Sequence, residues 1–171
     1  MRPLDVGTAL ASMKLLVDTR EQDTERARAR LAATGLPVLR VALPAGDYSC
    51  RVTLPDGTEM DFSKTIAIER KMSLDELCSC YTHERNRFVR EFERAKENNT
   101  KMYLLIENAS WDHAMMGRYK SQMTPQSLVA SMLVWMIRYD CHIVTISEFN
   151  SGKMIREILE REVKMILEEM D

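Results

Sequence analysis

Residues 66–75 read Ile66-Ala67-Ile68-Glu69-Arg70-Lys71-Met72-Ser73-Leu74-Asp75, and the other predicted elements are arranged around this stretch. The first half of this stretch is apolar and β-branched and predicts a strand, and the second half opens a helix. Side chains alternate along a strand, so Glu69 and Lys71 point to one side of the sheet and Arg70 points to the other. A carboxylate beside an ammonium at the end of a buried strand makes half of a metal-dependent phosphodiesterase site. The alternative is a salt-bridged strand end on the surface, because a motif this short often occurs by chance.

The composition of the chain is that of a soluble globular protein. Its 171 residues, of which 45% are hydrophobic and 29% are charged, suit one domain with a proper core. Four cysteines without framework spacing predict reduced thiols in an intracellular compartment, cytoplasmic in a prokaryote or phage and nuclear in a eukaryote. No signal pattern or membrane-length apolar run is present, so we expect no membrane partner. The net charge of -2 argues against a bulk electrostatic nucleic-acid binder, but it allows a nuclease with local basic patches.

Outward from residues 66–75, apolar strand runs alternate with capped helical stretches. We expect strands at 14–17, 37–43, 102–106 and 141–146, and a hairpin around 55–58 whose second strand reaches Lys71. We expect helices at 24–34, 74–80, 84–98 and 124–139 and from 151 onward, with residues 1–12 as a loose leader and 111–122 as an excursion holding one helical turn. This order predicts a single α/β domain over 1–171, with a mixed central sheet flanked by helices.

Three acidic residues lie at strand ends that this topology brings together. Asp18 ends the first strand, Asp47 sits in the turn before the hairpin, and Glu69 ends the strand that returns from it. Adjacent strand ends can place these oxygens in one coordination shell of Mg²⁺. With Lys71 on the same side as Glu69, the set matches what phosphodiester hydrolysis requires, namely a cation and a fixed positive group near the nucleophile.

Five blocks of the sequence resemble, in the same order, the XPF-type structure-specific endonucleases. The blocks are Val17-Asp18-Thr19-Arg20-Glu21, Gly46-Asp47, Glu69-Arg70-Lys71 with Asp75 after three further residues, Arg87-Phe88, and Tyr103-Leu104-Leu105-Ile106-Glu107. They extend over roughly Lys14 to Ile146, which is most of the chain. Five ordered blocks are far more specific than an isolated E-x-K.

The resemblance implies a restriction-endonuclease-like core that cuts branched or flapped DNA with Mg²⁺ or Mn²⁺. By matched position, Asp47 and Glu69 would be the principal metal ligands, Asp18 would support the metal or its water, and Lys71 would be the catalytic lysine. Asp75 would be the outer acidic member of the catalytic set. The alternative for Asp75 is a helix-start carboxylate that the helix dipole favours by itself.

Arginines near the acidic set are the expected DNA or phosphate contacts. The candidates are Arg20, Arg70 and Arg87. Arg20 could instead neutralise the acidic cluster, and Arg87 is preferred over its neighbours because it matches the family block. A zinc site at Cys78, Cys80 and His83 is disfavoured, since the run lacks a fourth ligand and does not place the three side chains on one side.

The helix at 124–139 is apolar on nearly every side, which predicts a homodimer through Thr124 to Tyr139 and the last helix. The alternative is that the last helix and the sheet bury it fully. We expect no helix-hairpin-helix module, which leaves the preference for branched DNA open.

Two functions of different classes follow from these observations. The first is an active endonuclease in DNA repair, recombination or phage DNA processing, with a Holliday-junction-type nuclease as its neighbour. The second is a non-cutting DNA-binding or interaction subunit that keeps the fold. The complete set of acids and lysine favours the active enzyme.

Overall fold

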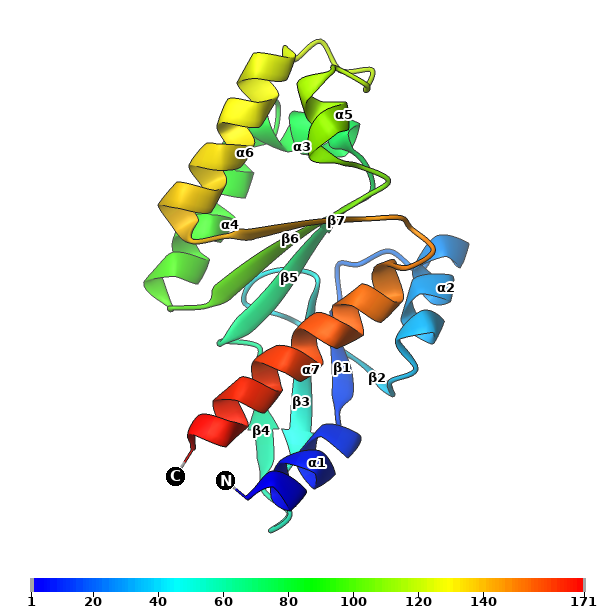
Figure 1. Cartoon of the computed structure of the whole chain (residues 1–171), viewed down its shortest axis with the longest axis vertical. Coiled ribbons are helices and arrows are strands. Elements are labelled where there is room, and N and C mark those ends of the chain that lie inside the picture. Colours follow the sequence, from blue (N-terminus) through cyan, green and yellow to red (C-terminus); the bar gives the residue numbers. More distant parts are fainter. Residues whose placement is uncertain (1, 171) are drawn as a thin grey trace.

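A computed structural model describes residues 2–170 and places a seven-stranded mixed sheet between two layers of helices (Figure 1). The strands are β1 Lys14–Asp18, β2 Val38–Val41, β3 Tyr48–Thr53, β4 Glu59–Asp61, β5 Ile66–Lys71, β6 Lys101–Glu107 and β7 His142–Ile146. The helices are α1 Pro3–Ala11, α2 Glu25–Thr34, α3 Leu74–Tyr81, α4 Arg85–Glu97, α5 Trp111–Met115, α6 Pro125–Tyr139 and α7 Ser151–Glu169. The prediction of a mixed sheet flanked by helices is therefore confirmed.

The sheet is antiparallel around β3 and parallel on either side, where β1 pairs with β2 and β5 pairs with β6. Its strand order is β2-β1-β3-β5-β6-β7, and β4 pairs with β3 outside this path. β3 is antiparallel to β1, β4 and β5, whereas β5, β6 and β7 are parallel. Helical crossovers connect the parallel strands, as parallel pairing requires. Residues 66–71 form β5, which borders β3 where the pairing changes from antiparallel to parallel.

The helix starts agree with the capping signals of the sequence. The hydroxyls of Thr24, Ser73 and Thr124 accept backbone N–H groups at the starts of α2, α3 and α6. The expected strand after the hairpin is broken, however, because the backbone turns at residues 62–65 and separates β4 from β5.

The predicted loose leader at residues 1–12 is wrong, since residues 3–11 form helix α1. Val6 and Ala9 of this helix are buried in the core shared with α7. A helix this short has little stability of its own and depends on tertiary packing. Its sequence pattern alone therefore carries little signal.

Two hydrophobic cores lie on opposite faces of the sheet. One joins α3, α4, α5 and α6 to one face of β5 and β6, and the other joins α1 and α7 to the opposite face. Ala67 belongs to the first core, whereas Ile66 and Ile68 belong to the second. The alternation of the strand therefore places Glu69 and Lys71 on the side of α3 and α4, and Arg70 on the side of α2 and α7.

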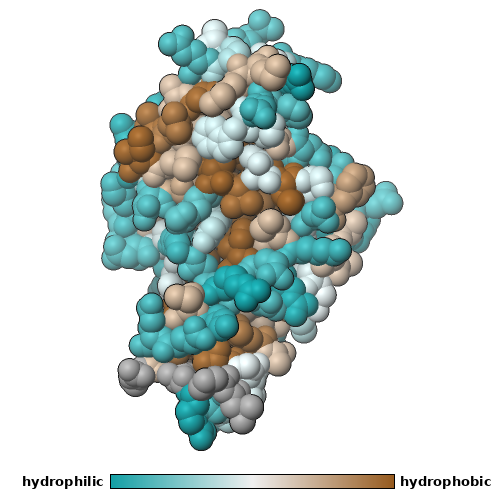
Figure 2. Space-filling model, viewed as in Figure 1, coloured by the Kyte–Doolittle hydropathy of each residue, from teal (hydrophilic) through white to brown (hydrophobic). Residues whose placement is uncertain are grey.

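Part of α6 faces away from both cores. Leu133, Val134 and Ile137 are exposed, and Ile137 reaches 82%. Figure 2 shows hydrophobic residues gathered over this helix. The alternative that α7 and the sheet bury α6 fully is wrong, because α7 covers the opposite face of the sheet (Figure 1).

No helix within residues 2–170 combines the length and the apolar character needed to cross a membrane.

Candidate active site

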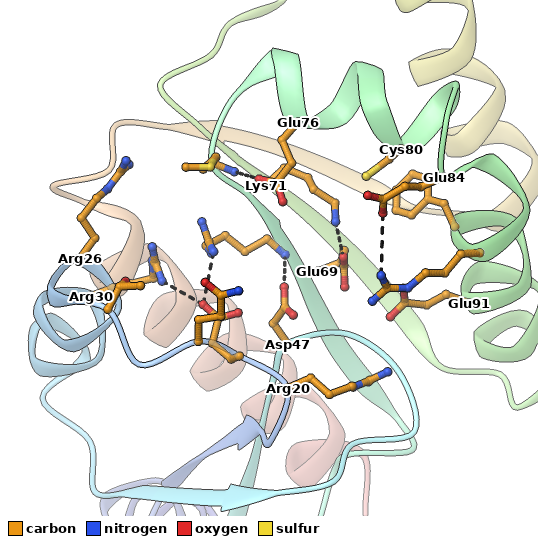
Figure 3. Close-up of a pocket in the computed structure, with 17 residues that line it drawn as sticks. Arg20, Arg26, Arg30, Asp47, Glu69, Lys71, Glu76, Cys80, Glu84 and Glu91 are labelled. Atoms are coloured by element: carbon orange, nitrogen blue, oxygen red, sulfur yellow. Dashed lines mark hydrogen bonds and ion pairs between the residues drawn. The ribbon is translucent and has the colours of Figure 1, made fainter.

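A cavity of about 480 Å³ opens beside the carboxyl end of β5 (Figure 3). The segment after β1, the loop before β3, the end of β5, α3 and α4 all contribute to its wall. Asp47, Glu69 and Lys71 line it together, with Arg20 and Arg87 on the same wall. The structure therefore brings together the central residues of the predicted site.

The loop that carries Asp47 depends on a glycine. Gly46 has a φ of +69°, and a Cβ at this position would come within 2.9 Å of the Ile68 carbonyl oxygen. The close approach lets the Asp47 N–H donate to that carbonyl oxygen at 2.8 Å. In return, the Arg70 N–H donates to Asp47 Oδ2 at 2.8 Å. Asp47 is thus fixed against β5 by its own backbone and by its carboxylate.

Glu69 and Lys71 form a buried ion pair rather than an exposed one. Lys71 Nζ lies 2.6 Å from Glu69 Oε1, and the two residues are only 6% and 8% exposed. The ammonium also lies 5.3 Å from the centre of the Phe88 ring on α4. The alternative of a surface salt bridge therefore does not describe this pair.

Two buried carboxylates at the cavity, those of Asp47 and Glu69, interact with each other. Burial and the nearby Glu21 carboxylate raise the pKa of Asp47 to about 6. Burial and the charge of Asp47 raise the pKa of Glu69 well above its usual range. Although burial opposes its charge, Lys71 has a raised pKa because the Glu69 carboxylate lies beside it. Burial and the neighbouring carboxylates thus oppose the charged forms of Asp47 and Glu69, and positive charge placed nearby would favour these forms.

This donor set fits a hard divalent cation. Mg²⁺ is commonly held by one or two carboxylates together with water and phosphate oxygens. Asp47 and Glu69 are such a pair, and their mutual repulsion is what a cation would relieve. Across residues 2–170, no group of three or more His, Cys, Asp or Glu side chains is arranged to hold a metal. Further ligands would have to be main-chain, solvent or substrate oxygens.

Asp18 is close in the fold but does not line the cavity. Both of its carboxylate oxygens accept hydrogen bonds, Oδ1 from Arg20 N at 2.8 Å and Oδ2 from Leu43 N at 2.8 Å. Arg20 Nε lies 2.6 Å from Oδ1 as well. Burial opposes the charge, but these bonds hold the pKa of Asp18 below its usual value. Asp18 is placed to orient Arg20 and the loop that leads to Asp47.

Asp75 is also absent from the wall of the cavity. Its Oδ1 accepts the N–H groups of Lys120 and Ser121 at 2.8 and 2.7 Å. These residues belong to the segment that precedes α6. The carboxylate therefore anchors that segment onto the first turn of α3.

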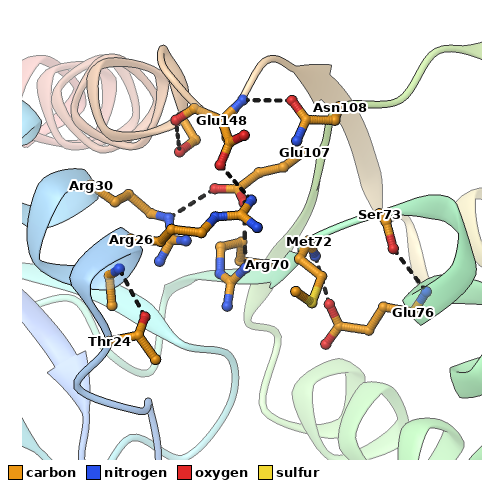
Figure 4. Close-up of polar contacts among 12 residues, drawn as sticks. Thr24, Arg26, Arg30, Arg70, Met72, Ser73, Glu76, Glu107, Asn108 and Glu148 are labelled. Carbon is orange, nitrogen blue, oxygen red and sulfur yellow. Dashed lines mark hydrogen bonds and ion pairs between the residues drawn. The ribbon is translucent and has the colours of Figure 1, made fainter.

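Arg70 lies in a polar network on the other side of β5 (Figure 4). Its guanidinium pairs with Glu21 at 3.3 Å and with Glu107 at 3.5 Å. Arg30 pairs with the same Glu107 at 2.8 Å, and Arg26 pairs with Glu148 at 2.6 Å. Carboxylates neutralise the arginines of this network. Arg70 thus links β5 to α2 while it lies at the edge of the cavity.

Glu91 of α4 was not predicted from the sequence to belong to the site. It lines the cavity and accepts the Gly46 N–H at 3.1 Å, so it ties α4 to the Asp47 loop. Its spacing of four residues from Arg87 places both on one helix face, and this was the available signal. Glu76 and Cys80 of α3 also line the cavity without having been predicted.

Comparisons with known proteins agree with this arrangement. The model of the ERCC4 domain family matches residues 17–153. Two solved structures of XPF from Aeropyrum pernix, the second in complex with DNA, have TM-scores of 0.62 and 0.61 with 22% and 23% sequence identity. The similarity covers 87% and 90% of this chain, but only 61% and 66% of the XPF chains. A comparison with curated proteins gave no match.

The family match runs from the end of β1 into the start of α7 and includes every residue that lines the cavity. The structural similarity independently shows that the chain has the same fold as the matched part of XPF. The chain therefore belongs to the ERCC4 domain family.

Proposed function

We propose that this protein is a metal-dependent DNA endonuclease that hydrolyses phosphodiester bonds. The observation that carries the proposal is the convergence of Asp47, Glu69 and Lys71 on one open cavity. Two carboxylates and an ammonium around a solvent-accessible space are the groups that this hydrolysis needs. Membership of the ERCC4 domain family supports the nuclease activity. The DNA complex of the XPF structure supports DNA as the substrate.

Asp47 and Glu69 would hold the cation, Mg²⁺ or Mn²⁺, with the main-chain carbonyl of Arg70 as a further donor. A divalent cation at this position supplies positive charge to phosphate oxygens and acidifies water. Lys71 keeps its proton at neutral pH because the adjacent Glu69 raises its pKa. It therefore acts as a fixed positive charge near the reacting phosphate and not as a base.

Asp18 and Asp75 have supporting roles in this proposal. Asp18 holds Arg20 at the wall of the cavity, and Asp75 holds the segment at Lys120 and Ser121. Arg20 and Arg87 contact phosphate, whereas Arg70 acts mainly through its ion pairs with Glu21 and Glu107. The preferred substrate is branched, flapped or forked DNA, in repair, recombination or phage DNA processing. We place the protein inside the cell, because its four cysteines are free thiols.

The protein would act as a homodimer that pairs through the exposed face of α6. The predicted share of the last helix in this interface is not kept, because α7 covers the opposite face of the sheet. Leu133, Val134 and Ile137 supply the apolar surface, and the adjacent edge strand β7 is half-buried along its length. An unpaired sheet edge beside an apolar helix face is a surface that association can cover.

The test is cleavage of labelled flap, fork, Holliday-junction and linear duplex DNA with Mg²⁺, Mn²⁺ or EDTA. Asp47→Ala should abolish cutting, and Lys71→Ala should lower the rate by about 10²–10³ because a preorganised positive group is lost. Lys64→Ala is a matched control, since Lys64 is exposed in the segment before β5 and lines no part of the cavity. Binding of Mn²⁺, followed by calorimetry, should be lost in Asp47→Ala and kept in the control.

Each other outcome points to a different conclusion. Binding of DNA without cutting in either metal would contradict the enzyme and favour a non-cutting DNA-binding subunit. Cutting confined to four-way junctions would favour a Holliday-junction-type nuclease. Cutting that survives both substitutions would show that the cavity is not the active site.

A further inference from the structure

A second cavity, of about 360 Å³, continues from the candidate active site along α4. Arg20, Arg87 and Glu91 line both cavities, so the two share a wall. Arg90 and Arg94 complete the second cavity. Four arginines thus surround a hollow that contains one carboxylate.

Two of these four arginines, Arg20 and Arg87, pair with the carboxylates of Asp18 and Glu84 at 2.6 and 3.9 Å. Arg90 and Arg94 have no such partner, since no ion pair joins either of them to a carboxylate anywhere in the described residues 2–170. Glu91 already accepts the Gly46 N–H. Glu93 is on another face of α4, where it accepts the Tyr139 hydroxyl. Among the residues that line the hollow, four arginines therefore face a single carboxylate.

Two of the cationic side chains have fixed partners, Arg94 on the loop that carries Asp47 and Arg20 at the end of β1. Arg94 Nη1 donates to the Pro44 carbonyl oxygen at 3.4 Å, and Asp18 fixes the guanidinium of Arg20 from behind. Arg87, Arg90 and Arg94 follow at intervals of three and four residues, so they occupy one face of α4. Seven helical residues span about 10 Å, the axial rise of about three nucleotides in a strand.

We propose that this hollow is a phosphate-binding track that holds the DNA backbone next to the scissile bond, with Arg90 and Arg94 as contacts beyond the catalytic cavity. The inference rests on the proposed nuclease function and deepens it. None of the residues that line the hollow is aromatic, so bases have no stacking platform there. The track therefore recognises the backbone and is independent of sequence.

The test measures how binding depends on salt. A labelled duplex is titrated with wild type and with Arg90→Ala/Arg94→Ala in EDTA, so that binding is measured without cutting. The slope of log K against log salt should become shallower by about 0.9 for each lost phosphate contact on duplex DNA. The loss of DNA affinity in this variant should be equal for duplexes of different sequence. Arg90→Lys/Arg94→Lys, which keeps the charges, should retain most of the slope.

The matched control is Arg28→Ala/Arg161→Ala, which removes the same net charge from exposed positions outside both cavities. This control should keep the wild-type slope. If this control has the same shallow slope as Arg90→Ala/Arg94→Ala, the inference is overturned, because the loss of net charge would then explain the change in slope.

Hydrolysis of a small phosphodiester, bis(p-nitrophenyl) phosphate, separates the inference from the proposed function. Arg90→Ala/Arg94→Ala should hydrolyse it at the wild-type rate, since this substrate reaches only the catalytic cavity. A parallel loss of this activity would overturn the track, because the arginines would then act on the active site itself. A wild type that neither binds nor cuts DNA would instead contradict the proposed function.

Discussion

Asp47 shows how one residue links the fold to the proposed chemistry. Its carboxylate is held by the Arg70 N–H, yet burial and Glu21 raise its pKa to about 6. A carboxyl group whose pKa is higher in the folded state than in the unfolded state binds a proton more tightly when folded. Its ionisation above pH 6 therefore costs folding stability, and this cost is absent below about pH 4.

We predict that, in EDTA, Asp47→Asn stabilises the protein at pH 7 by about 1–3 kcal/mol. The variant should also lose the rise in stability that Asp47 gives the wild type between pH 6 and pH 4. Chemical denaturation at several pH values measures both effects. Asp23→Asn, which removes an exposed carboxylate paired with Arg28, should leave the free energy of unfolding within about 0.5 kcal/mol. An equal gain in this control would refute the explanation.

Asp75 should affect cleavage less than Asp47 does, because it anchors the segment before α6 and does not line the cavity. Asp75→Asn keeps one carbonyl oxygen for the N–H groups of Lys120 and Ser121 and removes the charge. Cleavage should fall by less than about tenfold, whereas Asp47→Asn should lose it almost entirely. The comparison uses single-turnover cleavage of one substrate. Equal losses would restore Asp75 to the catalytic set.

The helices and strands could be predicted where local chemistry determines them. The caps at Thr24, Ser73 and Thr124 and the alternation of β5 carry their signals within a few residues. Convergence of Asp47, Glu69 and Lys71 also followed from strand order, but Asp18, which was predicted to join them, does not line the cavity. The partners of Asp75 and Glu91 could not be predicted, because these contacts join residues about 45 positions apart in the sequence.

The contact between α2 and α7 leaves no room for a side chain at Gly152. A Cβ at Gly152 would lie 2.2 Å from the Arg30 carbonyl oxygen and 2.9 Å from Ala33 Cβ. Gly152→Ala must push the two helices apart, and overpacking of this kind costs about 1–3 kcal/mol. Gly7→Ala in α1 meets nothing within 4 Å and should instead stabilise by about 0.4–1 kcal/mol. Urea denaturation of both variants measures the difference, and a stable Gly152→Ala would show that α2 can move.

The exposed apolar face of α6 predicts that two copies of the protein associate. Ile137→Glu should shift sedimentation from dimer to monomer, because a carboxylate cannot be buried unpaired in an apolar interface. Met165→Glu on α7, a change at another exposed hydrophobic residue, should leave the dimer intact. A wild type that sediments as a monomer at every concentration would refute the proposed pairing.

The junction in the sheet has a mechanical consequence. Within residues 2–170, β3 and β5 share one paired position, Tyr48 opposite Ile68, whereas β5 is paired with β6 along its whole length. Asp47 directly precedes the antiparallel strand β3, and Glu69 lies in β5. A cation bound by both Asp47 and Glu69 would link β3 to β5 and reduce the motion of one strand relative to the other. Hydrogen exchange at the amides of β3 and β5 should therefore slow on addition of Mg²⁺.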